Sequence, residues 1–183
     1  MRELSLHIMD IVENGLAAGA SIIYIAISEE SNVNRLCVTI RDNGSGIPAE
    51  KLARATDPFF TTRTTRRVGL GLSLFRESAR RSEGDLTIAS REGYGTEVQA
   101  IFRRDHIDVP PLGDMPGTLS SLLMGNADVD FCYTHELDGR SFGFDTREVK
   151  KELGGLLLTT PVVLQHITGM IRQGLAELYK QDY

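Results

Sequence analysis

The sequence is poor in the features that mark secreted proteins, proteins with a structural metal site and membrane-spanning proteins. It has only two cysteines, Cys37 and Cys132, whose spacing fits neither a metal site nor a disulfide framework. It has no stretch of about 20 apolar residues, and no basic segment followed by an apolar run at its start. We therefore expect two buried thiols, no contact with a membrane and a cytoplasmic location.

The sequence also lacks an excess of positive charge. Its 183 residues hold 20 lysines and arginines against 25 aspartates and glutamates, a formal net charge of −5 at pH 7. Because nucleic-acid surfaces need clustered cations, this balance argues against nucleic acid as a partner. The length and the 41% hydrophobic content suit one domain, or one domain with an appended subdomain.

Apolar periodicity predicts a sequence of helices and strands in the first hundred residues. A helix is expected from Glu3 to about Ala18, with Gly19 as its left-handed cap. An antiparallel hairpin of strands 21–28 and 35–41 should follow, then a short helix 49–55, a mobile loop 61–68, a helix 70–82 closing at Gly84, and strands 85–90 and 96–102.

A second region begins at the proline- and glycine-rich stretch 109–117. Asp138-Gly139 predicts a hairpin of strands 129–137 and 140–145, followed by helices 146–153 and 161–179. We predict two units, 1–104 and 105–183. Apolar residues of the second are expected to pack against the first: Leu156, Leu157, Leu158, Val162, Val163, Ile167 and Ile171.

Asp10 and Asn14 lie one helical turn apart along one edge of the first helix, whereas Glu13 lies nearly opposite the apolar stripe. The Asn14 amide oxygen is a suitable ligand for Mg²⁺, which prefers hard oxygen donors. The Asp10 carboxylate can orient or deprotonate an attacking water. Taken alone, Asp10 and Asn14 are better explained as ordinary polar residues at the border of a buried helix face, with no role in binding.

Two glycine-containing segments are candidates for nucleotide contact. The turn from Asp42 to Gly46 follows a strand, and its glycines permit close backbone approach to a flat ligand. The tetrapeptide Gly69-Leu70-Gly71-Leu72 opens a helix, where free backbone N–H groups can hold phosphate oxygens. Each segment alone is also typical of an ordinary turn, so their order and spacing decide.

That order resembles the successive boxes of GHKL (Bergerat-type) nucleotide-binding domains, which histidine kinases share with type II topoisomerases, a heat-shock chaperone class and MutL-type repair proteins. The matching segments are Asp10–Ala20, Asp42–Ile47, Asp57–Arg63, Gly69–Leu72 and Gly95-Thr96. Asp-Pro-Phe-Phe-Thr-Thr-Arg and Gly-Leu-Gly-Leu-Ser resemble histidine kinases, and Val-Glu-Asn-Gly-Leu-Ala-Ala-Gly-Ala-Ser is nearer to MutL. The resemblance covers about Glu3 to Arg103.

The resemblance implies an α+β protein, a two-layer α/β sandwich with a small C-terminal α+β extension, that binds ATP and Mg²⁺. By this likeness Asn14 holds the metal, Asp42 binds the adenine amino group and Thr96 supports the adenine. Gly44 and Gly46 line the base, and Phe59 and Phe60 anchor a lid. The full predicted nucleotide set is Asn14, Asp42, Gly44, Gly46, Ile47, Arg63, Gly69, Leu70, Gly71, Leu72 and Thr96, with Asp10 as the catalytic residue.

The implied activity is phosphoryl transfer in trans or slow ATP hydrolysis in signalling. None of the histidines has the context expected of a phosphoacceptor: His7 is expected on the polar edge of the first helix, and His106, His135 and His166 lie in or beside the second region. A protein partner is therefore expected, and a homodimer is possible. The alternatives are a noncatalytic ATP-dependent switch and an inert scaffold that binds no nucleotide.

Overall fold

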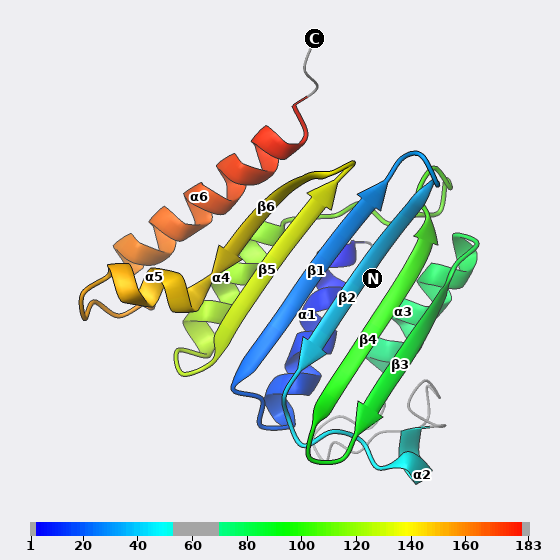
Figure 1. Cartoon of the computed structure of the whole chain (residues 1–183), viewed down its shortest axis with the longest axis horizontal. Helices are drawn as coiled ribbons and strands as arrows, with labels where there is room; N and C mark the ends of the chain where they lie inside the picture. Colours follow the sequence, from blue (N-terminus) through cyan, green and yellow to red (C-terminus); the bar gives the residue numbers. More distant parts are fainter. Residues whose placement is uncertain (1–2, 53–69, 181–183) are drawn as a thin grey trace.

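The chain folds around a mixed β-sheet, drawn in Figure 1. The computed structural model describes residues 3–52 and 70–180, and these form six strands in the order β3-β4-β2-β1-β5-β6. The strands are β1 (Ile22–Glu30), β2 (Arg35–Asp42), β3 (Asp85–Arg91), β4 (Gly95–Arg103), β5 (Asp130–Leu137) and β6 (Arg140–Asp145). The helices are α1 (Leu4–Ala17), α2 (Ala49–Leu52), α3 (Leu70–Arg81), α4 (Met115–Gly125), α5 (Thr146–Glu152) and α6 (Pro161–Leu178).

One face of the sheet is covered by helices, and α1, α3 and α4 lie behind it in Figure 1. Alternate residues of the strands point to this face and are buried, as in β1 and β2: Ile23, Ile25, Ile27, Leu36, Val38 and Ile40. The apolar stripe of α1 packs on them through Leu4, Ile8, Ile11 and Val12. The predicted two-layer α+β sandwich is confirmed.

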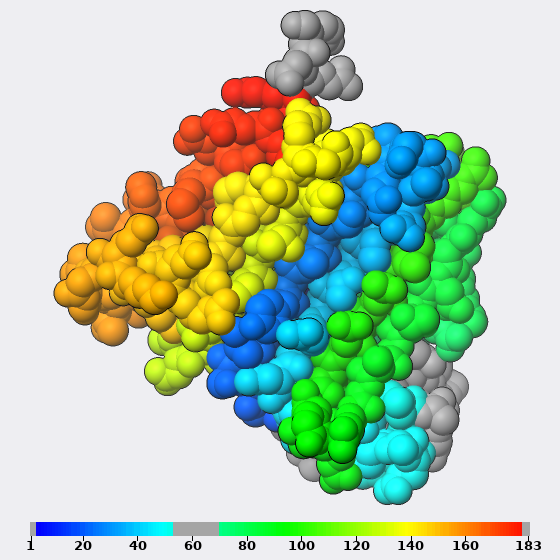
Figure 2. Space-filling view, viewed as in Figure 1, coloured from blue at the N-terminus to red at the C-terminus, as the bar shows by residue number. Residues whose placement is uncertain are grey.

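The central strands are uncovered on the opposite face, where Figure 2 shows them side by side. Their outward side chains interact with one another across strands. The Arg41 guanidinium lies 5.0 Å from the centre of the Tyr24 ring, and Gln99 donates a 3.4 Å hydrogen bond to Thr39. Polar outward and apolar inward positions therefore fix which face of the sheet receives the helices.

Left-handed residues end α1 and α3 and turn the last hairpin. Gly19 takes φ +76°, as predicted for the cap of α1, and the Asp138-Gly139 turn has φ +50° and +84°. At the end of α3 the left-handed residue is Glu83 (φ +55°), whereas the expectation placed the close at Gly84. A Cβ at Gly84 would stand 1.7 Å from the Ile101 carbonyl oxygen, so this glycine permits close packing against β4.

The C-terminal residues extend the same sheet. Strand β5 pairs with β1 in parallel, and β6 then pairs with β5 in antiparallel orientation. Helix α4 precedes them and was missed by sequence reasoning, because the proline- and glycine-rich stretch 109–117 was interpreted as a boundary between two units. Proline is tolerated in a first helical turn, and the Asp114 side chain caps the helix by accepting a 3.0 Å bond from Gly117 N–H.

The packing predicted for the last apolar residues is partly wrong. Leu158, Ile167 and Ile171 are buried, but α6 packs mainly on α4, β5 and β6, which belong to the second region itself. Leu156, Leu157 and Val162 are instead 63%, 69% and 74% exposed, because they lie in the α5–α6 connection and at the start of α6 rather than on its packed face. In residues 3–52 and 70–180, no helix combines the length and the apolar character that a membrane crossing requires.

A buried polar cluster attaches the end of α6 to the sheet. The Glu29 carboxylate accepts hydrogen bonds from His135 Nε2 (3.1 Å), from Arg104 Nε (3.0 Å) and from the Tyr179 hydroxyl. His135 is fully buried, and its Nδ1 lies 2.9 Å from the Tyr133 hydroxyl. Burial by itself would raise the pKa of Glu29, but these hydrogen bonds outweigh it and lower the pKa to about 2.

Candidate functional site

The last turn of α1 lies against the end of β2 because residue 15 is a glycine. A Cβ at Gly15 would stand 2.9 Å from the Asp42 Cβ and 3.2 Å from its Oδ2. Any side chain there would displace the Asp42 carboxylate. Sequence reasoning did not include Gly15 in the site, although an isolated glycine inside a helical pattern is a signal of close packing or function.

The glycine turn after β2 is attached to the end of α1. Asp42 Oδ1 accepts a 2.8 Å bond from Gly44 N–H, and Ser45 N–H donates a 2.9 Å bond to the Ala18 carbonyl. Asn43 Oδ1 accepts from the backbone of Ser21 and Ile22 at 2.9 and 3.0 Å. A Cβ at Gly44 would stand 2.9 Å from the Ala18 Cβ, so the turn fits this place only with glycine.

The same turn is also joined to β3. Gly46 has φ +70°, and a Cβ there would stand 2.1 Å from the Arg91 carbonyl oxygen. Ile47 N–H donates a 2.8 Å bond to Ser90 Oγ. The predicted residues Asp42, Gly44, Gly46 and Ile47 therefore belong to one turn that is attached to α1 on one side and to β3 on the other.

Asp42 is partly withdrawn from water next to Thr96. The two residues are direct partners in the β2–β4 pairing. Partial burial raises the pKa of Asp42, and hydrogen bonds from the backbone of Gly44 and Thr96 act against this rise. A carboxylate held in place with a perturbed pKa is typical of a ligand-binding group.

The start of α3 meets α1 at Asp10. A Cβ at Gly71 would stand 3.2 Å from both Cβ and Oδ2 of Asp10. Leu70 is exposed and Leu72 packs partly against the core, so the first turn of α3 lies at the surface with its backbone near α1. The first N–H groups of a helix lack helical partners, which makes this end suitable for an anion.

Of the remaining predicted site residues, the structure describes Asn14 but not those between residues 53 and 69. Asn14 is exposed on the last part of α1. Arg63, Gly69, the aromatic pair Phe59 and Phe60, and the predicted lid 61–68 lie outside the described residues. The contacts among the described residues join α1 to the turn after Asp42 and, separately, to the start of α3.

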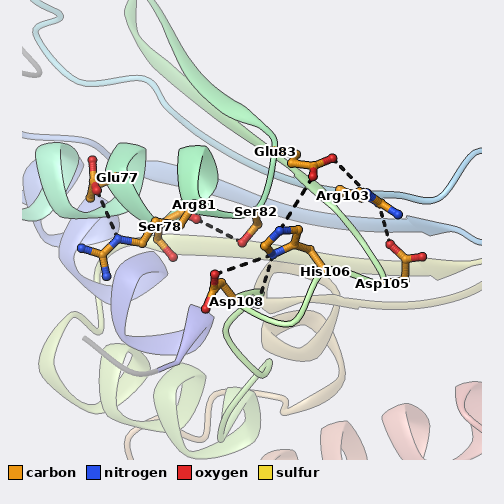
Figure 3. A network of polar contacts seen from close by, with 9 residues as sticks. All are labelled: Glu77, Ser78, Arg81, Ser82, Glu83, Arg103, Asp105, His106 and Asp108. Atoms are coloured by element: carbon orange, nitrogen blue, oxygen red, sulfur yellow. Dashed lines mark hydrogen bonds and ion pairs between the residues drawn. The ribbon is translucent and has the colours of Figure 1, made fainter.

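The arginines of α3 form ion pairs at the surface. Arg76 and Arg80 contact Asp85 at 3.0 and 3.2 Å, and Arg81 contacts Glu77 at 3.1 Å. Figure 3 shows the Arg81–Glu77 pair beside a second group, in which Arg103 bridges Glu83 and Asp105 and His106 lies between Glu83 and Asp108. These contacts attach the end of α3 to the chain that follows β4.

The expectation that His7 lies on a polar edge is wrong. Its side chain is 1% exposed and stacks on Phe75 of α3, with ring centroids 4.9 Å apart. Neither ring nitrogen has a hydrogen-bond partner among the described residues, and burial lowers the pKa of His7 to about 4. His7 is therefore a neutral packing residue between α1 and α3.

A hollow of about 650 Å³ lies at the other end of β1, away from Asp42. It is lined by the β1–β2 and β5–β6 turns and includes the carboxylates of Glu30, Glu136 and Asp138. Because three carboxylates repel phosphate, this hollow does not suit a nucleotide. The geometry favours the three converging segments as the candidate site.

Comparison with known proteins gives a family match over this part of the chain. The model for "Histidine kinase-, DNA gyrase B-, and HSP90-like ATPase" matches residues 2–106. A putative sensor protein of Shewanella frigidimarina is 31% identical over 103 residues, which cover 55% of this chain and 16% of that protein. Sporulation kinase C of Bacillus subtilis is 28% identical over 100 residues, or 55% of this chain and 23% of that kinase.

Sensor protein kinase PilS of Pseudomonas aeruginosa is similar to the same part, with 30% identity over 105 residues, covering 55% of this chain and 20% of that kinase. The chain thus spans less than a quarter of the length of these relatives. Among solved structures, the N-terminal domain of a DNA repair protein has a TM-score of 0.57 and 14% identity, covering 78% of this chain and 52% of that chain. That likeness concerns the fold alone.

Proposed function

Since the chain belongs to the histidine kinase-, DNA gyrase B- and HSP90-like ATPase family, we propose that it binds Mg-ATP between α1, the turn after Asp42 and the start of α3. The observation that carries this proposal is the convergence of these segments. Gly15 lies against Asp42, and Gly71 lies against Asp10. Both contacts are made with α1, which supports a single site along this helix for a base, a metal and phosphates.

In this proposal each segment has its own part of the nucleotide. The Asp42 carboxylate accepts a hydrogen bond from the adenine amino group, with Thr96 beside it and the backbone of Gly44 and Gly46 along the base. Backbone N–H groups at the start of α3, from Leu70 to Leu72, hold phosphate oxygens. The predicted roles of Arg63 and Gly69, on the phosphates, belong to the same proposal.

Asn14 is the proposed protein ligand for Mg²⁺. It is exposed and offers one amide oxygen, a donor of the hard type that Mg²⁺ prefers. The described residues hold no group of three His, Cys, Asp or Glu side chains suited to a metal, so phosphate and water oxygens must complete the shell. When bound, the metal neutralises phosphate charge during transfer.

The proposed activity is phosphoryl transfer to a partner protein, or slow hydrolysis, in a signalling protein of the histidine-kinase type. Positioning and charge neutralisation supply most of the rate of such reactions, and Asp10 is the proposed group that orients the attacking water. The second region, 105–183, is the proposed docking or self-association part. Its exposed Leu156, Leu157 and Val162 support this assignment.

A noncatalytic switch is the second candidate, in which ATP changes affinity for a partner. The position of Asp10 favours it, because a carboxylate lying against Gly71 stabilises the positive end of α3 without any role in chemistry. Incubation with terminally labelled Mg-ATP, with and without candidate partners, separates the two. Labelled partner or released phosphate supports the enzyme, tight binding without turnover supports the switch, and no binding contradicts both.

A further inference from the structure

Ser90 stands beside the residues proposed to bind the base and contacts both the glycine turn and Thr96. It pairs with Thr96 between β3 and β4, and Thr96 pairs with Asp42 between β4 and β2. The three residues therefore lie in one row across three neighbouring strands. They share the helix-covered face of the sheet with the buried residues Leu86, Val98 and Ile40.

The hydrogen bonds of Ser90 have only one consistent direction. Its Oγ donates to the Gly95 carbonyl oxygen at 2.9 Å, because a carbonyl can only accept. It accepts from Ile47 N–H at 2.8 Å, because an amide N–H can only donate. The third contact joins Ser90 Oγ to Thr96 Oγ1 at 2.9 Å. Since a serine hydroxyl has a single proton, Thr96 must be the donor in this contact.

The Thr96 hydroxyl therefore has its proton committed to Ser90 and offers only lone pairs to a ligand. Asp42, its neighbour in the row, is also an acceptor, with Oδ1 bound to Gly44 N–H. Two adjacent groups thus accept hydrogen bonds and donate none. A ligand atom that also carries only lone pairs would be left unpaired beside them, which a partly buried site penalises.

We propose that Ser90 is a positioning residue that fixes Thr96 as an acceptor and so makes the site select a 6-amino purine over a 6-oxo purine. This inference rests on the proposed ATP site. Ser90 acts through Thr96 and does not itself contact the base. Ser90 also accepts a hydrogen bond from Ile47 and so holds the glycine turn. Loss of Ser90 should therefore weaken binding of every nucleotide and, in addition, reduce the preference for the 6-amino purine.

The test compares the dissociation constants of Mg-ATP and Mg-ITP by calorimetry, because the two nucleotides differ only in the group at position 6 and the proton on N1. Wild type should bind ATP more tightly. Ser90→Ala frees the Thr96 hydroxyl to rotate and donate to the 6-oxo group, so the preference for ATP should fall by about 10-fold. Ser90→Thr keeps a hydroxyl and should retain most of the preference.

Two further variants separate specificity from loss of structure. In a Thr96→Val background, Ser90→Ala should leave the ATP/ITP ratio unchanged, since there is no hydroxyl left to orient. Ser82→Ala is the matched control: Ser82 is a fully buried serine whose hydroxyl bonds to the Ser78 carbonyl at 3.2 Å, away from the base end. It should leave the ratio at the wild-type value.

The outcomes are distinguishable from failure of the proposed function. If wild type binds neither nucleotide, the ATP site itself is refuted. If Ser90→Ala weakens ATP and ITP by the same factor, Ser90 is only structural and this inference is overturned while the ATP site stands. A change in ratio on Ser90→Ala in the Thr96→Val background also overturns it, because the effect would not pass through Thr96.

Discussion

The Asp42 carboxylate lies directly against the backbone of Gly15, so that a methyl group added to Gly15 would stand 2.9 Å from the Asp42 Cβ. This distance is shorter than ordinary carbon–carbon contact. Because Gly15 has no side chain, the helix that carries Asn14 can lie directly against the strand that carries Asp42. The relationship gives a direct way to perturb the site without substituting any proposed ligand residue.

Gly15→Ala should weaken Mg-ATP binding by at least about 10-fold, because the new methyl displaces Asp42. Gly169→Ala is the matched control, a glycine inside α6 with no atom within 4 Å of the added Cβ. It should raise the free energy of unfolding by about 0.5–1 kcal/mol, as expected for alanine in a helix, and leave binding unchanged. Calorimetry and urea unfolding measure both. Equal binding by Gly15→Ala and wild type would contradict the placement of Asp42.

Asp42→Asn should lose most of the ATP affinity without destabilising the free protein. The raised pKa means that folding favours protonated Asp42, so at neutral pH the ionised form costs stability. An uncharged amide avoids this cost, and the unfolding free energy at pH 7 should stay equal or rise. Affinity should fall by at least about 10-fold, since the base then meets an amide of mixed polarity. A clear loss of stability would show that ionised Asp42 is structural.

Much of this site could be predicted from the sequence because its parts are local signals. The turn after Asp42 and the start of α3 depend on glycines next to a strand or a helix, and such glycines are visible in the chain itself. Gly15 and Ser90 were missed since their importance depends on which residues meet across the fold. His7 was misplaced for the same reason, because α3 covers the edge of α1 that an isolated helix would expose.

The fold of the second region shows the same limit. Its hairpin was predicted from Asp138-Gly139, a local turn signal, but its parallel pairing with β1 is a contact between distant segments. Helix α4 was missed because the proline- and glycine-rich stretch 109–117 was interpreted as a boundary, whereas Pro116 and Gly117 are tolerated in the first turn of a helix. Local sequence patterns thus predicted the helices and strands better than they predicted which strands pair with one another.

Acid should loosen the attachment of α6 through Glu29. Its pKa lies at about 2 in the folded protein against an ordinary 4.5, so ionised Glu29 stabilises the fold fully above pH 4.5. That contribution, on the order of 3 kcal/mol, is lost as the pH falls from 4.5 toward 2. Glu29→Gln should remove this pH dependence and lower the unfolding free energy at pH 7 by about 2–3 kcal/mol.

The control for Glu29 is its neighbour Glu30, which forms a surface ion pair with Arg35 at 2.5 Å, with the arginine side chain 49% exposed. Glu30→Gln should change the unfolding free energy by less than about 1 kcal/mol, because exposed pairs are screened by water. Urea unfolding between pH 3 and pH 7 gives both values. Equal costs for the two variants would show that the Glu29 cluster does not stabilise the fold.

Asp10→Ala should abolish any slow ATP hydrolysis while Mg-ATP still binds, because the proposed role of Asp10 is to orient water. The expected loss in turnover is about 100-fold or more, as is usual for a general base. Asp128→Ala, a change at an exposed acid beyond α4, is the control and should hydrolyse ATP as wild type does. Equal rates for Asp10→Ala and wild type would remove Asp10 from the chemistry and favour the switch.

The central claim is that α1, the turn after Asp42 and the start of α3 border a single Mg-ATP site. Amide NMR during a titration with Mg-ATP tests it most directly, with Gly15, Gly44 and Gly71 reporting on the three segments. The account predicts that all three signals shift with one common dissociation constant while Gly169 in α6 stays unmoved. Shifts confined to one segment, or a folded protein whose spectrum ignores the nucleotide, would contradict it.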